Sequence, residues 1–553
     1  MRKKFITRAV NKILLLAQII FLSAGVVIPQ LSFQLTEKAD TYFAMNLGRY
    51  VLENGFPHVD PFTIHENLQL VAQQWLSGIF FWEFYKFLGA DGLRLADCLI
   101  GIILIVIYWR LCLLVSGGKK FLSFALSFGV CLIISNWIVP RPHIISAAIL
   151  LSEVFFLEKF TRTQNFKFLL PLPVLSMLLV NFHAALWLMA LVVCLPFLFV
   201  KDPRHIKFLL AAMAAIFLCG LINPYGLDAM TYVFRSYGVD LISNNIPEMQ
   251  TPTAHNLRGK IFYLCEALII FSLAKFKAPC RYILLSGGII FMAIMHGRNL
   301  ILFYFLATFP LAYACQNFNI KKFFPNDGKY INRNVMTILF FLLLAINTVF
   351  IAKILKYGFG NLSLPLKILF VSELLFLFYD LLIAKVGGRI IHPKILPKKI
   401  LSMFLVALIL GGIFSTTLNF DKKESDETYT AALKVLVERE RPENILLYVN
   451  QGYGGLAGTF GIKYYIDSRS EVFIPANNGQ KNILEEYFDL RRGKIYYADF
   501  FARYNFTHII TTSEDYILYE HLSRDKNFRV IYESERVEGR KVIHCKIFVP
   551  KKD

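Results

Sequence analysis

The feature that most constrains this chain is its succession of long apolar runs, which suit lipid better than a soluble core. Of the 553 residues, 56% are hydrophobic and only 18% are charged, a composition typical of an α-helical polytopic membrane protein. A helix needs about 20 mostly apolar residues to cross a membrane. We predict about 13 spans, near residues 12–32, 93–115, 119–137, 144–158, 166–180, 184–200, 207–222, 261–275, 281–296, 299–315, 334–355, 364–384 and 400–418.

Basic residues gather in alternate loops between these runs. The loops on one face, counted from the N-terminal segment 1–12 onward, hold 26 Lys or Arg residues and only three acids, Glu158, Asp202 and Asp327. Cytoplasmic loops carry such an excess. We therefore predict a multi-pass protein of the cytoplasmic (inner) membrane with a cytoplasmic N-terminus and an outer C-terminal domain. The net charge of +20 does not indicate a nucleic-acid partner, because residues 421–553 balance 21 bases with 21 acids.

The first outer loop, residues 33–92, is predicted to contain two interfacial helices. From Asp40 to Glu53 the apolar residues recur with helical spacing, as Phe43, Leu47, Tyr50 and Val51. Asp40 suits an N-cap and Asn54-Gly55 a helix end, so we expect this helix to lie with its apolar side in lipid. A second helix, rich in Trp and Phe, is expected over 73–88. The prolines of "FPHVDPF" between the two helices would restrict the position of Asp60.

Polar clusters at helix ends and in loops converge on the outer face. They are "VPRPH", "NFHAALW", "INPYGLD", "NIPEMQTPTAHN" and "MHGRN", while the inner ends are plain Lys and Arg loops. This asymmetry favours a functional site on the outer face. Each residue also has a structural alternative: "NPYG" forms a good turn, His183 can end a helix, Arg141 can reach from lipid to the interface, and Asp40 can be a cap and nothing more.

Residues 421–553 are predicted to form a separate α/β domain outside the membrane, after a transmembrane domain over 1–420. The segments "NILLYVN", "KYYID" and "THIITTS" read as buried strands, with helices around 428–440, 482–491, 496–504 and 515–524 and a final hairpin that turns at Glu538-Gly539. "GYGGLAG" follows the first strand and opens a helix, where backbone N–H groups can hold an anion. We favour the simpler interpretation that its glycines only allow a tight turn.

With these features in place, the sequence resembles the GT-C superfamily of polytopic glycosyltransferases, which use lipid-linked sugars. The resemblance begins with an acid at the exit of the first span, Asp40, and continues through Gly48-Arg49, a proline loop and Trp75-Leu76. It extends to "RPH", Asn181-x-His183, "NPYG", "HGRN" and the tail segment "GYGGLAGTFGIKYYIDSRSEVF". In layout the chain resembles the lipid A aminoarabinose transferases and the protein O-mannosyltransferases. The second acid that the superfamily usually carries beside the first is missing, because Thr41 follows Asp40.

The resemblance implies transfer of a sugar from a polyprenyl-phosphate or polyprenyl-diphosphate donor to an envelope lipid, glycan or protein. Asp40 would be the general base, and Asp60 a second candidate catalytic residue. No cofactor is implied, and a divalent metal is left open. The residues expected to bind substrate are Arg49, Arg141, His143, Asn181, His183, Asn223, Tyr225, His296, Arg298 and Asn299.

Two other classes of protein remain open on sequence grounds. Acids inside predicted spans, namely Glu153, Glu266, Glu373 and Asp380, are also found along ion routes, so a transporter or flippase of lipid-linked glycans is one alternative. A non-catalytic envelope assembly protein that binds through its outer domain is the other.

Overall fold

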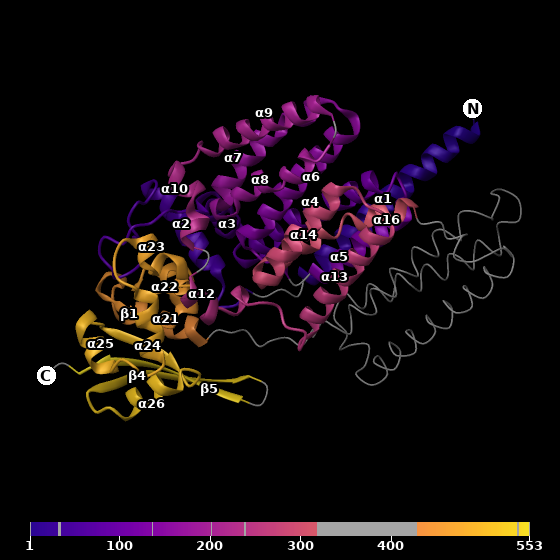
Figure 1. The fold of residues 1–553 in the computed structure, drawn as a ribbon. Coiled ribbons are helices and arrows are strands. Elements are labelled where there is room, and N and C mark those ends of the chain that lie inside the picture. Colours follow the sequence, from indigo (N-terminus) through magenta and orange to yellow (C-terminus); the bar gives the residue numbers. More distant parts are fainter. Residues whose placement is uncertain are drawn as a thin grey trace, which may run out of the picture.

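The computed structural model describes residues 2–30, 35–134, 137–200, 202–236, 239–317, 428–538 and 541–551. A helical bundle occupies one part of the molecule and an α/β domain caps one end of it, far from the N-terminus (Figure 1). The predicted spans at 334–355, 364–384 and 400–418 and the predicted domain boundary at residue 420 lie outside the described residues.

The helices of the bundle follow the predicted apolar runs. They are α1 (Arg2–Gln30), α4 (Ala90–Val115), α5 (Lys120–Ile134), α6 (Pro142–Thr163), α7 (Pro171–His183), α9 (Pro203–Gly220), α13 (Leu257–Lys275) and α14 (Cys280–Met295). By length and composition, three described stretches are able to cross a membrane: Ala90–Val115, Phe166–Leu186 and Pro203–Gly220. The mostly helical architecture with apolar helices is confirmed, whereas the number of spans stays a prediction.

Two predicted spans are not single helices. The run at 184–200 is divided into η3 (Ala184–Leu186), α8 (Leu188–Val192) and η4 (Leu195–Leu198). The run at 299–315 is divided into α15 (Leu300–Leu302), the π-helical turn η7 (Phe303–Ala307) and α16 (Leu311–Asn317). Pro196 lies within η4 and Pro310 directly precedes α16. A proline has no N–H for the helical ladder, which is consistent with a break near each.

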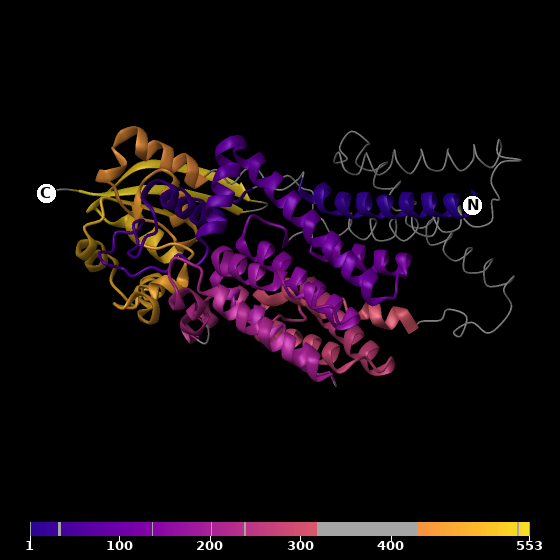
Figure 2. The same ribbon diagram turned by 90° about the horizontal axis from the view of Figure 1, so that it is seen from above.

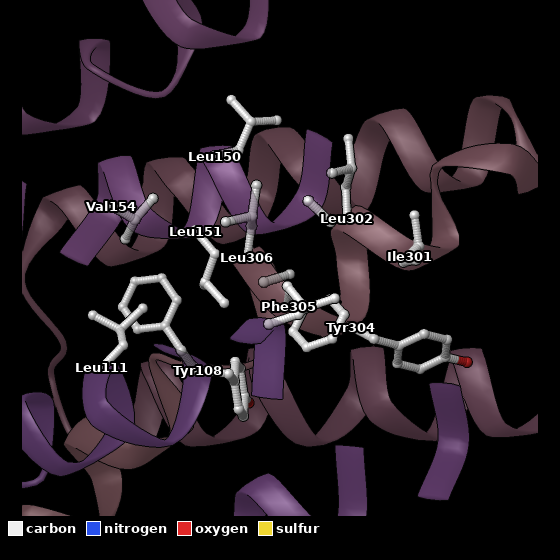
Figure 3. Packing of buried hydrophobic residues seen from close by; sticks show 14 of the residues in the cluster. Tyr108, Leu111, Leu150, Leu151, Val154, Ile301, Leu302, Tyr304, Phe305 and Leu306 are labelled. Atoms are coloured by element: carbon white, nitrogen blue, oxygen red, sulfur yellow. The ribbon is translucent and has the colours of Figure 1, made fainter. Parts of the chain in front are cut away.

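The main core of the bundle lies between α4, α6 and the segment around η7. Figure 3 shows Tyr108 of α4, Leu151 of α6 and Phe305 of η7 meeting there. The rings of Tyr108 and Phe305 lie 5.5 Å apart in an edge-on arrangement. The Tyr108 hydroxyl, which is fully buried, is within 2.7 Å of the Thr308 hydroxyl. The π-helical turn is therefore held by both apolar packing and a buried hydrogen bond.

Two of the three acids on the predicted cytoplasmic face have structural partners. The carboxylate of Glu158 receives hydrogen bonds from Arg162 Nε at 3.1 Å and from Arg281 Nε at 2.9 Å. Asp202 precedes α9 and accepts a hydrogen bond from the backbone N–H of Arg204 at 2.9 Å. These acids neutralise a basic cluster and cap a helix, which explains their presence among so many cations.

The two helices of the first outer loop are confirmed as α2 (Asp40–Asn54) and α3 (Trp75–Leu88), ending at Gly55 and Gly89. The expectation that the apolar side of α2 faces lipid was wrong. Phe43, Leu47 and Val51 are buried and form a cluster with Ala72, against which Phe62, Trp75 and Ile79 pack. Other parts of the protein, and not the bilayer, therefore cover the apolar side of α2.

The C-terminal domain contains a five-stranded sheet in the order β2-β1-β3-β5-β4. Its strands are β1 (Leu446–Tyr448), β2 (Lys463–Tyr464), β3 (His508–Thr512), β4 (Phe528–Glu538) and β5 (Lys541–Pro550), and its main helices are α21 (Thr428–Arg439), α22 (Gly454–Thr459), α24 (Ile483–Arg491), α25 (Tyr497–Tyr504) and α26 (Tyr516–Arg524). Strand β1 pairs in parallel with β2 and β3, whereas β5 is antiparallel to β3 and β4. The predicted strands, helices and final hairpin all occur.

The first outer loop and the C-terminal domain are packed together, and Figure 2 shows violet segments of the loop lying within the orange and yellow domain. Leu68 and Leu70 of the loop belong to the same buried cluster as Tyr448 and Phe473 of the domain. The carboxylate of Glu37 accepts hydrogen bonds from two backbone N–H groups in the first turn of α21, at 3.1 and 2.6 Å. The loop therefore contributes to the core of the domain.

The glycine-rich segment "GYGGLAG" has a packing role that the sequence did not reveal. It forms α22, which lies against α2, and the carbonyl of Gly455 accepts a hydrogen bond from Asn46 Nδ2 at 2.8 Å. A Cβ atom at Gly455 would lie 2.9 Å from the backbone nitrogen of Phe43. The tight-turn interpretation is thus incomplete, because this glycine permits close contact between two helices.

Candidate active site

Asp40 is the first residue of α2, but its side chain does not cap the helix. The N-cap is Ala39, and no side-chain capping bond forms. The Asp40 carboxylate instead lies 3.0 Å from Arg141 Nη2 and accepts a hydrogen bond from the Ser468 side chain. Partial burial raises the pKa of Asp40, although Arg141 and Ser468 act in the opposite direction. Since the side chain is still 40% exposed, a reactant is able to reach it.

Arg141 joins two acids from different segments of the predicted outer face. Its Nη1 lies 3.1 Å from Glu248 Oε1, so the guanidinium stands between Asp40 and Glu248. Burial raises the pKa of Glu248, but the charge and hydrogen bond of Arg141 outweigh that effect, and the pKa lies below its usual value. Arg141 occupies an extended position directly before α6. This arrangement puts one cation and two carboxylates at the end of the bundle next to the C-terminal domain.

Four residues predicted to bind substrate line one small cavity of about 60 Å³: His143, His183, Arg298 and Asn299. The His183 Nδ1 atom is 2.9 Å from the Ser146 hydroxyl, and Asn299 Nδ2 donates to the carbonyl of Met292 at 2.9 Å. These bonds fix the positions of the side chains. Residues at or near the ends of different helices therefore meet at one place on the predicted outer side.

His296 lies next to this cavity. Its Nδ1 atom is 2.8 Å from the carbonyl oxygen of Met249, whose sulfur atom is 3.5 Å from Arg298 Nη1. Met249 itself is buried at the edge of the C-terminal domain core. His296 and Arg298 are thus both held by the segment that carries Glu248.

Three other predicted residues, Asn181, Asn223 and Tyr225, form a separate group. Asn181 accepts a hydrogen bond from Trp75 Nε1 at 3.0 Å and donates to the carbonyls of Met177 and Ile222. Asn223 closes its own turn through Gly220, Tyr225 and Gly226. The Tyr225 hydroxyl donates to the carbonyl of Pro57 at 2.9 Å.

Asn181 and Asn223 border a mostly apolar groove of about 470 Å³ that Trp75 and Leu76 also line. Their side chains are used for hydrogen bonds within the fold, as described above. This agrees with the turn interpretation of "NPYG". The groove is distinct from the polar cavity, since the two share no lining residue.

Arg49 and Asp60 contact other parts of the protein. The Arg49 guanidinium lies over the ring of Trp82 at 5.5 Å, between α2 and α3. Asp60 is fully buried, and its Oδ1 atom is 2.6 Å from Arg469 Nη1. Its Oδ2 atom accepts a hydrogen bond from the backbone N–H of Thr63 at 3.0 Å. Both oxygens of Asp60 thus have partners within the fold, a geometry that suits a positioning residue.

Sequence reasoning did not assign four residues that the structure brings to this region. Ser468 contacts Asp40, Glu248 contacts Arg141, and Gln73 and Glu471 line the polar cavity. Ser468 and Glu471 follow the segment "YYID" in the C-terminal domain. The segment "DSRSE" (467–471) was the available signal, but nothing in its pattern indicated that it contacts the helical bundle. Among the described residues, no group of three or more His, Cys, Asp or Glu side chains is arranged to hold a metal ion.

Solved structures of two other proteins have a similar fold. The oligosaccharyltransferase of Archaeoglobus fulgidus, in its apo form, matches with a TM-score of 0.53 at 12% identity, over 91% of this chain and 69% of that one. ArnT of Cupriavidus metallidurans matches in its apo state with a TM-score of 0.54 at 13% identity, over 95% of this chain and 97% of that one. The same enzyme bound to undecaprenyl phosphate matches with a TM-score of 0.52 at 10% identity, over 97% and 98%.

The chain therefore shares its fold with these two proteins, both of which are GT-C glycosyltransferases. The resemblance expected from the sequence is confirmed at the level of the fold. The similarity to ArnT covers nearly all of both chains. No family model matches the chain, and no curated protein matches its sequence.

Proposed function

We propose that the chain is a glycosyltransferase that uses a polyprenyl-phosphate or polyprenyl-diphosphate sugar. The acceptor is an envelope lipid, glycan or protein on the outer face of the cytoplasmic membrane. The observation that carries this proposal is the Asp40–Arg141 pair, in which Oδ2 and Nη2 lie 3.0 Å apart. The pair lies at the end of a helical bundle with the GT-C fold. A base and a phosphate-binding cation are the two groups that such a transfer needs side by side.

Asp40 acts as the general base. An acceptor hydroxyl or amine attacks the anomeric carbon of the sugar and gives its proton to the Asp40 carboxylate. The bond between that carbon and the donor phosphate oxygen breaks, and its electron pair stays on the phosphate. The raised pKa of Asp40 makes the carboxylate a better proton acceptor than an ordinary surface aspartate.

Arg141 and Arg298 bind the phosphate of the donor. A guanidinium presents several N–H donors in a planar fork, which suits a phosphate better than an ammonium does. Arg141 already holds two carboxylates, so a phosphate nearby would compete with them for its donors. Positive charge at this point stabilises the negative charge that develops on the leaving oxygen.

The test is a transfer assay with purified protein in liposomes and a polyprenyl-phosphate-linked sugar. We expect product on an added acceptor, with the Asp40→Asn variant at least ~100-fold slower because it lacks the base. The matched control is Asp91→Asn, an exposed acid in the first turn of α4, which should keep normal turnover. Movement of the lipid across the bilayer without transfer would establish the flippase alternative, and neither activity would favour an assembly protein.

A further inference from the structure

The polar cavity beside the proposed catalytic pair receives one side chain from the C-terminal domain. Glu471 lies in the short helix η11 (Ser470–Phe473) and lines the cavity with Gln73 and Tyr232. Gln73 Nε2 donates a hydrogen bond to Glu471 Oε1 at 2.9 Å. Asn477 Nδ2 donates to the backbone carbonyl of Glu471 at 2.9 Å. The outer loop thus holds the carboxylate of Glu471, and the C-terminal domain holds its backbone.

A buried ion triad holds the segment that carries Glu471. The guanidinium of Arg469 contacts Asp467 of its own segment and Asp60 of the first outer loop, each at 2.6 Å. The three side chains are at most 4% exposed. Arg469 also lies over the ring of Phe43, 4.3 Å from its centroid. The segment from Asp467 to Glu471 is therefore packed against α2, next to Asp40.

The hydrogen-bonding groups around the cavity are mixed in kind. Glu471 and the buried Gln73 Oε1 are acceptors, and Gln73 Oε1 has no hydrogen bond to any other described residue. Arg298 and the buried hydroxyl of Tyr232 are donors in the same lining. A phosphate requires donors only, an ammonium requires acceptors only, and a lipid tail requires neither. A hydroxyl group both donates and accepts, so it fits this set best.

The size of the cavity limits what enters it. Its volume is about 60 Å³. A cavity of this size suits a substituent of a sugar ring. The charge of Arg298 acts on both Asp40 and Glu471, which puts the cavity within electrostatic reach of the proposed base.

We propose that Glu471, supplied by the C-terminal domain, binds a hydroxyl substituent of the transferred sugar and so determines which sugar is accepted. The inference rests on the proposed function, because it assumes a lipid-linked sugar at this site. Gln73 is the partner residue from the outer loop, and the Asp60–Arg469–Asp467 triad is the positioning device. The domain is then part of the sugar site as well as a cover for it.

The test compares two probes on the full-length protein in nanodiscs: undecaprenyl phosphate without sugar, and a panel of undecaprenyl-phosphate hexoses and pentoses. For the sugar that adds most affinity, Glu471→Gln should weaken binding about ten- to a hundred-fold, the usual effect of losing a charged hydrogen bond. Binding of undecaprenyl phosphate itself should not change. Gln73→Ala should reproduce this selective loss, because Gln73 lines the same cavity from the outer loop. Glu520→Gln, on the surface of α26, is the matched control and should leave both affinities unchanged.

The possible results separate the inference from the proposed function. Equal loss for both probes in Glu471→Gln and Gln73→Ala would mean that these residues support the phosphate site or the fold, and would overturn the inference. Unchanged affinities, or a wild-type protein to which no sugar of the panel adds affinity, would also overturn it while leaving the proposed function standing. A wild-type protein that binds neither kind of lipid would refute both.

Discussion

Arg469 Nη1 lies 2.6 Å from Asp60 Oδ1, although the two residues are 409 positions apart in the chain. The same guanidinium contacts Asp467, so one buried cation ties the first outer loop to the C-terminal domain. With both acids and the arginine nearly inaccessible to water, the charges depend on each other for compensation. This contact decides how the segment carrying Ser468 and Glu471 meets α2.

Replacing Arg469 should therefore destabilise the whole assembly. We expect Arg469→Met to lower the free energy of unfolding by about 3–5 kcal/mol, because two buried carboxylates lose their counter-ion. Denaturant unfolding of the purified protein in detergent measures this. Arg524→Met, which removes an exposed pair with Glu520, should cost below about 1 kcal/mol. Equal effects of the two substitutions would contradict the role given to the triad.

His65 should make this junction sensitive to acid. Its Nε2 atom is 2.8 Å from the carbonyl of Tyr465, and burial lowers the pKa of His65 to about 4. Among the charges that act on it, Asp60 and Glu486 oppose this shift and Lys481 favours it. Because the folded state prefers neutral His65, its stabilising contribution is complete above about pH 6.5 and is lost as pH falls towards 4.

The expected loss from this one group is about 3 kcal/mol between pH 7.5 and 4. Unfolding measured across that range gives the total pH dependence, to which other groups contribute. His65→Gln keeps a side-chain N–H and removes the titration, so the difference between variant and wild type isolates the histidine. A difference that stays constant with pH would show that His65 does not titrate as described.

The hydrogen bond from Ser468 should set the pH at which activity is lost. It lowers the pKa of Asp40, while burial raises it. A general base works when deprotonated, so the rate falls as pH drops through that pKa. Ser468→Ala should move the acid limb of the kcat/KM profile to higher pH and leave the plateau nearly unchanged. The control is Ser470→Ala, in the same segment as Ser468, which removes a hydrogen bond from Gln451. It should not shift the acid limb. A shift of equal size would mean that the effect comes from the structure of the segment.

Arg141 and Arg298 should be needed for affinity towards the donor phosphate. We expect either Arg→Ala change to weaken binding of undecaprenyl phosphate about ten- to a hundred-fold, through the loss of a charged hydrogen bond. Calorimetry or fluorescence quenching in nanodiscs measures it. Arg94→Ala, near the start of α4 with its partner Asp91, is the control. Wild-type affinity in both test variants would remove these arginines from the site.

The predicted orientation of the chain is open to a direct test. We expect the N-terminus in the cytoplasm and the C-terminal domain outside, given 26 bases against three acids in the inner loops. A reporter enzyme that is active only outside the cytoplasm should therefore be active when it is fused after Asp553. A reporter that is active only in the cytoplasm should be inactive at the same position. The reverse pattern would put the proposed site on the wrong face of the membrane.

Features with a local physical cause were predictable from the sequence. The apolar spacing of Phe43, Leu47 and Val51 predicted α2, and the glycines after Asn54 and Leu88 predicted the ends of α2 and α3. Short apolar runs predicted the buried strands β1, β2 and β3 of the C-terminal domain. The outer clusters around Arg141 and Arg298 were also expected to meet, because their helix ends were assigned to one face.

The amino-acid sequence alone determined that this chain is helical, apolar and equipped with an acid at the exit of its first span, because these depend on residue type and short-range spacing. Only the tertiary structure decided what the acid touches and what covers α2. The partners of Asp40 lie 101 and 428 positions away, at Arg141 and Ser468, and Glu471 reaches the cavity from the C-terminal domain. No local pattern encodes such meetings, since they arise only when packing brings a docked domain onto the outer loop.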